Sequence, residues 1–332
     1  KMHLSRPTGR GLGLAIVVVF GVGAMSVASA GIVAKQLAGP PTEFADMRAP
    51  DAVEATIHSH SALLSLDSLA NTSKRGWQAT LPVENGALRF ALLIPEDSAV
   101  DVVLKGPNGQ KLRAADTAKS LKPSRFGIDG AQVPARMYSF ESLAKGVWSI
   151  ELANTSRKAV SGFLLLEGDP ATELASYATH RRQIVGETLG LTAQLTAVDA
   201  RDNAMLGAKA GRIERATLTV TRPDGVTETF PMFDDGQHED GIAGDGLFGA
   251  AFTARMAGDH VAQVTIEGID HAGHRVVRSA EHLLPFVAPS IALTGKRASA
   301  SYAKSGPTRL SIRIPVTAAK GAGHYRGYAE VW

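Results

Sequence analysis

One segment of the chain gathers residues that could do chemistry, and this segment is strongly acidic. Residues 234–245 hold five carboxylates, and no Lys or Arg occurs between Arg222 and Arg255. This density of negative charge costs repulsion, which a hard divalent cation would relieve. Calcium takes about six to eight oxygen ligands and suits flexible loops with glycines. We therefore predict a structural calcium site with the ligands Asp234, Asp235, Asp240 and Asp245.

The same loop also allows an interpretation without metal. Three Asp-Gly pairs occur in it, at 235–236, 240–241 and 245–246. An Asp side chain in such a turn commonly accepts a hydrogen bond from its own backbone. The proposed ligands fall at positions 1, 2, 7 and 12 of the loop, which is not the alternating EF-hand spacing. Both interpretations stay open from the sequence.

No motif for catalysis is present. His238-Glu239 begins like a zinc-protease helix, but Ile242 stands where the second His is needed. Nucleophile elbow, P-loop and dinucleotide patterns are missing, and the chain has no cysteine. We therefore expect no enzyme, although a Ser-His-Asp set assembled from distant residues stays open.

Two further histidine groups could bind zinc. His58 and His60 could place two imidazoles on one strand face, but no third ligand is evident, so surface histidines are the alternative. His271 and His274 flank a turn, where solvated side chains are expected. No cofactor other than calcium is predicted.

The elements that position these residues are expected to be strands. From Trp77 onward, apolar residues alternate with polar ones and Gly- or Pro-containing turns separate the runs, which is typical of an all-β protein of tandem immunoglobulin-like or jelly-roll sandwiches. A short helix is expected within Asp51–Ala70, where Val53, Ile57 and Leu64 recur at loose three-to-four spacing. The domain boundaries predicted from these patterns are a sandwich over 77–168, a second over 181–288 that carries the acidic loop, and the start of a further, truncated β-domain over 289–332.

The first thirty residues predict a cleaved signal peptide. Lys1, Arg6 and Arg10 are their only charged residues, an apolar run follows, and Ala28-Ser29-Ala30 has the small-x-small pattern of a cleavage site. A membrane anchor is the alternative. Residues 31–76 are expected to be a linker with the short helix. Beyond the leader, 32 basic residues balance 32 acidic ones, so neither nucleic acid nor an anionic membrane surface is expected as a partner.

The loop pattern Asp-Asp-Gly-x-x-x-Asp-x-x-Ala-Gly-Asp-Gly-x-Phe resembles that of immunoglobulin-like domains in exported bacterial surface proteins, including the choice-of-anchor X type. In those loops a Gly usually precedes the middle Asp, where this chain has Glu239. The resemblance implies a secreted or periplasmic bacterial protein that is non-catalytic and binds an unknown protein or glycan. The alternative is an accessory region of a larger secreted hydrolase.

Overall fold

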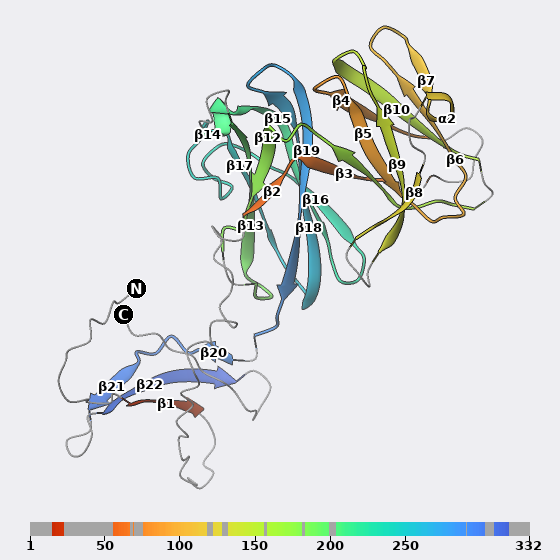
Figure 1. Cartoon of the computed structure of the whole chain (residues 1–332). Coiled ribbons are helices and arrows are strands. Elements are labelled where there is room, and N and C mark those ends of the chain that lie inside the picture. Colours follow the sequence, from red (N-terminus) through yellow and green to blue (C-terminus); the bar gives the residue numbers. More distant parts are fainter. Residues whose placement is uncertain are drawn as a thin grey trace, which may run out of the picture. The chain divides into compact units, whose positions relative to one another are not determined.

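The fold is described by a computed structural model of the chain. It describes residues 15–22, 56–66, 69, 76–117, 122–127, 132–155, 158–180, 183–198, 204–289, 291–302 and 309–318. The chain divides into two compact units, one formed by residues 1–49 with 288–332 and the other by residues 50–287. The acidic loop lies in the second of these units, which contains two β-sandwiches (Figure 1).

The first sandwich packs a four-stranded sheet against a five-stranded sheet. The four-stranded sheet has the order β4 (Trp77–Val83), β10 (Gly146–Asn154), β6 (Val100–Lys105) and β7 (Lys111–Arg113). The five-stranded sheet has the order β3 (Ser61–Ser65), β11 (Phe163–Glu167), β5 (Leu88–Leu93), β9 (Val133–Phe140) and β8 (Lys122–Phe126). A single helical turn, α2 (Ala114–Thr117), follows β7.

Alternation along these strands builds the first core. Trp148, Ile150 and Leu152 of β10 are fully buried on one face, because successive side chains of a strand point to opposite faces. From the other sheet, Phe90 stacks on Tyr138 with ring centroids 4.9 Å apart. The indole N–H of Trp148 donates to the Ala144 carbonyl at 2.9 Å, so this large side chain is buried without an unpaired donor.

The second sandwich packs a five-stranded sheet against a four-stranded sheet. The first follows the order β14 (Ala204–Leu206), β13 (Thr188–Val198), β12 (Thr172–Ser176) and β2 (Ile57–Ser59), with β17 (Leu247–Thr253) also paired to β13. The second has the order β16 (Thr227–Pro231), β15 (Gly211–Thr221), β18 (Gly258–Asp270) and β19 (Arg275–Phe286). A short 3-10 helix, η1 (Gly207–Lys209), precedes β15. All strand pairs in both sheets are antiparallel.

The other unit contains one small sheet. β22 (Arg309–Ala318) pairs antiparallel with β20 (Ile291–Leu293) and β21 (Ser299–Tyr302), and parallel with β1 (Ala15–Val22). The expected β-structure over 289–332 is therefore present in β20, β21 and β22. The predicted cleavage site at Ala28–Ala30, residues 31–55 of the predicted linker and residues 319–332 of the predicted further β-domain lie outside the described residues.

The all-β prediction is confirmed, but the short helix expected within Asp51–Ala70 is wrong for the described part of that segment. Residues 57–59 and 61–65 form β2 and β3, which pair with β12 and β11. The three-to-four spacing predicted a helix wrongly, because Ala62 and Leu64 follow a period of two and pack in the first core. The boundary expected over 168–182 likewise contains β12, so strands of both sandwiches extend beyond the predicted limits.

Candidate functional site

Asp240 is the buried centre of the acidic loop that joins β16 to β17. Its side chain is only 1% exposed. One carboxylate oxygen accepts the Gly236 N–H at 2.6 Å, and the other accepts the His238 N–H at 2.9 Å. Burial disfavours the charged form, but the backbone N–H groups outweigh burial, and the pKa of Asp240 lies below its ordinary value. Asp240 is therefore a carboxylate that holds the turn before it.

Asp234 closes the far end of the loop. Its two oxygens accept the N–H groups of Gly244 and Gly246 at 2.7 and 2.9 Å. Asp235 accepts the Gln237 N–H at 3.0 Å and contacts the His238 ring nitrogen Nδ1 at 2.9 Å. This contact with His238 is the main reason why the pKa of Asp235 is lowered. Both carboxylates are thus bonded inside the loop.

Asp245 follows the same pattern, since it accepts the Leu247 N–H at 2.9 Å. The four predicted ligands therefore lie in one loop, but each is bonded to backbone N–H groups, as the interpretation without metal expects. Within the residues that the structure describes, no three His, Asp or Glu side chains are grouped so that they could hold a metal ion. The calcium site stays a prediction.

Glu239 stands where related loops usually carry glycine, and its backbone explains the usual residue. Its φ is 67°, in the left-handed region that glycine adopts without steric cost. The Glu239 side chain turns to His180, with Oε2 3.4 Å from Nε2. It therefore pairs with a neighbouring histidine.

A melting experiment on the full chain separates the two interpretations of the loop. If calcium binds, millimolar calcium should raise the melting temperature of the tandem sandwiches by a few degrees over chelator, because a ligand specific for the folded state stabilises it. Asp240→Asn should abolish this shift. Asp224→Asn, in an Asp-Gly turn of the same sandwich outside the loop, should leave it intact. Equal melting temperatures with calcium and with chelator would leave only the hydrogen-bonded turns.

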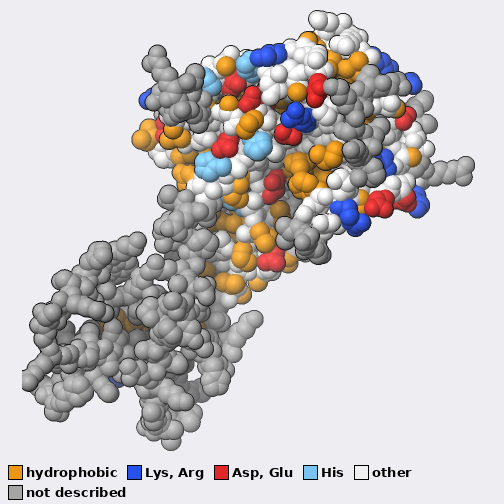
Figure 2. Space-filling model, in the orientation of Figure 1, with side chains coloured by type: hydrophobic (Ala, Val, Ile, Leu, Met, Phe, Trp, Pro, Cys, Tyr) orange, Lys and Arg blue, Asp and Glu red, His pale blue; other side chains and the backbone are white. Residues whose placement is uncertain are grey.

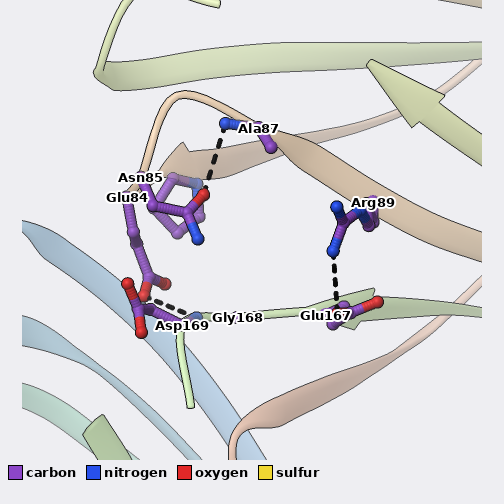
Figure 3. A pocket seen from close by; sticks show the side chains of 8 residues that line it. Glu84, Asn85, Ala87, Arg89, Glu167, Gly168 and Asp169 are labelled. Atoms are coloured by element: carbon purple, nitrogen blue, oxygen red, sulfur yellow. Dashed lines mark hydrogen bonds and ion pairs between the residues drawn. The ribbon is translucent and has the colours of Figure 1, made fainter. Parts of the chain in front are cut away.

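The most enclosed charged pair in the described residues joins the two sandwiches. Arg278 of β19 is fully buried and Glu84, just after β4, is 6% exposed. The guanidinium Nη1 and Nη2 donate to Oε1 and Oε2 of Glu84 at 2.7 and 2.8 Å. Figure 3 shows Glu84 beside Asp169, whose N–H donates to Glu84 at 2.9 Å. The bidentate pair thus links the first sandwich to the second through the connecting segment.

Carbonyl oxygens take the remaining N–H groups of Arg278. Nε donates to the Thr172 carbonyl at 3.0 Å, Nη1 to the Val277 carbonyl at 3.0 Å, and Nη2 to the Asp169 carbonyl at 3.2 Å. A guanidinium has five N–H donors, so every one of them is used. This pair could not be predicted from the sequence, because Glu84 and Arg278 are 194 positions apart. The one available signal was an Arg on the inward register of β19, which is apolar except for Arg278 and His282.

Ser176 and His282 form a second buried polar contact between β12 and β19. The Ser176 hydroxyl donates to the Thr192 carbonyl at 2.6 Å, and its oxygen lies 2.8 Å from Nε2 of His282. A hydroxyl has one hydrogen, so the imidazole Nε2–H donates to the serine. Burial lowers the pKa of His282 to about 4. Ser176 is fully buried with its proton turned away from the imidazole, so this contact is structural.

Two of the four histidines weighed for zinc lie beside carboxylates. His58 is 3.3 Å from Glu173, and His274 is 3.3 Å from Asp270. Figure 2 shows histidines and acidic side chains next to one another on the visible face of the sandwiches. Beside Glu84, the hollow of about 20 Å³ has room for little more than a water molecule. Neither feature forms a catalytic set.

Comparison with known families decides the class of the two sandwiches. Residues 61–166 match the family model described as "Conditioned medium factor 1st Ig-like domain". Residues 172–286 match the model described as "Conditioned medium factor 2nd Ig-like domain". The chain carries two immunoglobulin-like domains in tandem. Both matched models describe immunoglobulin-like domains, which agrees with the prediction of a non-catalytic protein. The prediction of the choice-of-anchor X type is not supported by these matches.

A curated relative spans both immunoglobulin-like domains. The conditioned medium factor of Dictyostelium discoideum is 26% identical over 320 residues, and the match covers 84% of this chain and 45% of that protein. Among solved structures, a DUF4785 family protein from Legionella pneumophila matches 71% of this chain and 63% of its own, at 13% identity and a TM-score of 0.49. The lipase BlEst2 from Bacillus licheniformis, in its propeptide form, matches with a TM-score of 0.37 at 12% identity and covers 68% of this chain and 41% of its own.

None of the helices in the part of the chain that the structure describes has the length and apolar character needed to cross a membrane.

Proposed function

We propose that the chain is an exported, non-catalytic protein that works outside the cell as a binding or structural module. The observation that carries this proposal is the match of both sandwiches to the immunoglobulin-like domains of conditioned medium factor, a protein whose name places it in medium conditioned by cells. The leader pattern supports export. A protein or glycan is the proposed ligand, because immunoglobulin-like sandwiches commonly serve as cell-surface modules. Calcium and a bacterial source remain predictions.

Export is tested by expressing the full chain and sequencing the N-terminus of the protein recovered from the periplasm or medium. We expect cleavage after Ala30, so that the mature chain begins at Gly31. Ala30→Gln should block processing because the cleavage site needs a small residue there. Ser29→Gln is the matched control, since the middle position of the small-x-small pattern tolerates larger side chains. Retention of the unmutated chain inside the cell would contradict the proposal, and an intact leader on membrane-bound protein would indicate an anchor.

A further inference from the structure

Strand β2 lies ahead of the first immunoglobulin-like domain in the sequence but belongs to the sheet of the second. It pairs antiparallel with β12, with Ile57, His58 and Ser59 opposite Ser176, Ala175 and Leu174. The next strand, β3, belongs to the first sandwich, where it pairs with β11. Only His60 separates the two strands. The chain therefore passes from the second sandwich to the first within one residue.

The side chains of β2 fit the second core. Ile57 packs against the buried cluster that contains Leu174, Leu189 and Phe252. His58, the next residue, turns to the other face, where its side chain is 52% exposed beside Glu173. The two positions alternate as in any half-buried strand. The second domain as matched over 172–286 thus lacks a strand that contributes to its own core.

Beyond β2, polar contacts fix β3 to the outer face of the second sandwich. The Leu63 N–H donates to Ser279 Oγ at 2.8 Å, and Gln263 Nε2 donates to the Leu63 carbonyl at 2.8 Å. Ser279 also donates to Glu281 at 2.8 Å. Ser279 and Glu281 lie on β19, the strand of the buried Arg278 that holds Glu84, and Gln263 lies on the neighbouring strand β18. The junction is therefore held by backbone pairing, by hydrogen bonds and by a buried ion pair.

We propose that β2 is a strand which the N-terminal segment donates in cis to the second immunoglobulin-like domain, so that the two domains fold as one cooperative body with one fixed relative orientation. Loss of β2 would leave an unpaired strand edge on β12 and uncover the part of the second core that Ile57 covers. The first domain cannot separate from the second unless β2 or β3 gives up its pairing.

Amide hydrogen exchange of the full chain, read by mass spectrometry, tests this proposal with two neighbouring substitutions. Ile57→Ser removes the apolar side chain that β2 gives to the second core. His58→Ser changes the exposed residue beside it on the same strand and is the matched control. We expect Ile57→Ser to raise exchange in β12 and β13, more than 110 positions away, by at least about tenfold, since local opening free energies set the exchange rate. His58→Ser should leave those strands unchanged.

Calorimetry supplies the second readout. Both sandwiches should unfold in a single transition, and Ile57→Ser should lower the midpoint temperature of that transition. Separate transitions for residues 61–166 and 172–286 in the unmutated chain would overturn the proposal. It would also be overturned if Ile57→Ser raised exchange only within residues 57–65, because β2 would then contribute nothing to the second domain.

Discussion

Replacing Arg278 by methionine should lower the free energy of unfolding of the tandem domains by about 3–5 kcal/mol. Methionine matches the length of the arginine stem but leaves the Glu84 carboxylate buried with the Asp169 N–H as its remaining partner. Breaking a buried ion pair from one side is costly, since the other charge stays desolvated and uncompensated. Urea unfolding followed by far-UV circular dichroism measures the loss.

Two further variants serve as controls for Arg278→Met. Arg89 and Glu167 form an exposed pair 3.5 Å apart within the first sandwich, so Arg89→Met should cost no more than about 1 kcal/mol. The double variant Glu84→Met/Arg278→Met should recover part of the lost stability, because it removes the buried Glu84 carboxylate that has no cation beside it. The carbonyls of Thr172 and Asp169 still lack the N–H donors of Arg278. A cost for Arg278→Met equal to that of Arg89→Met would show that the buried pair does not stabilise the junction.

Acidification from pH 6.5 to pH 4 should remove about 3 kcal/mol of stability through His282 alone. Burial lowers the pKa of His282 from 6.5 to about 4 in the folded chain. The unfolded chain therefore takes up a proton at His282 as the pH falls below 6.5, while the folded chain does not. The stabilising contribution is complete above pH 6.5 and is lost progressively down to pH 4, at about 1.36 kcal/mol per pH unit.

His282→Gln isolates this contribution, because glutamine does not titrate and its amide can still donate to Ser176. We expect the variant to lose less stability than the unmutated chain between pH 6.5 and 4, while carboxylate titration affects both equally. His274→Gln is the control, since that histidine is 36% exposed beside Asp270. Parallel stability curves for the unmutated chain and His282→Gln would mean that His282 is as easily protonated in the folded state as in the unfolded state.

Periodicity predicted most strands correctly because they are half-buried. β13 and β18 alternate over nine or more residues each, and β15 alternates after a bulge at Ile213–Arg215; a core on one face requires this pattern. Periodicity could not identify the short strands. β2 has three residues, and its place in the second sandwich depends on β12, which lies more than 110 positions further along the chain. Pairing at that distance leaves no local signal.

The candidate site, too, could be predicted from the sequence only in part. The acidic loop could be located from composition, whereas the hydrogen bonds of its carboxylates depend on where backbone N–H groups point, which composition does not determine. The bonds to Asp234 come from Gly244 and Gly246, ten and twelve residues later. Glu84 and Ser176 carried no signal at all, because each acquires its role only when β19 packs against β12 and the first sandwich.

The crossing of β2 also determines how the tandem domains would bear a mechanical load. Tension that enters the tandem domains at their N-terminal end meets the chain first at β2, and tension that leaves at their C-terminal end does so after β19. Both strands belong to the second sandwich, so the direct path of the force runs through that domain, although the first domain lies covalently between the two points. Only after β2 has been pulled from β12 does the first domain come under load. Under tension the chain would therefore unfold in a set order, in which the three-residue strand β2 detaches first.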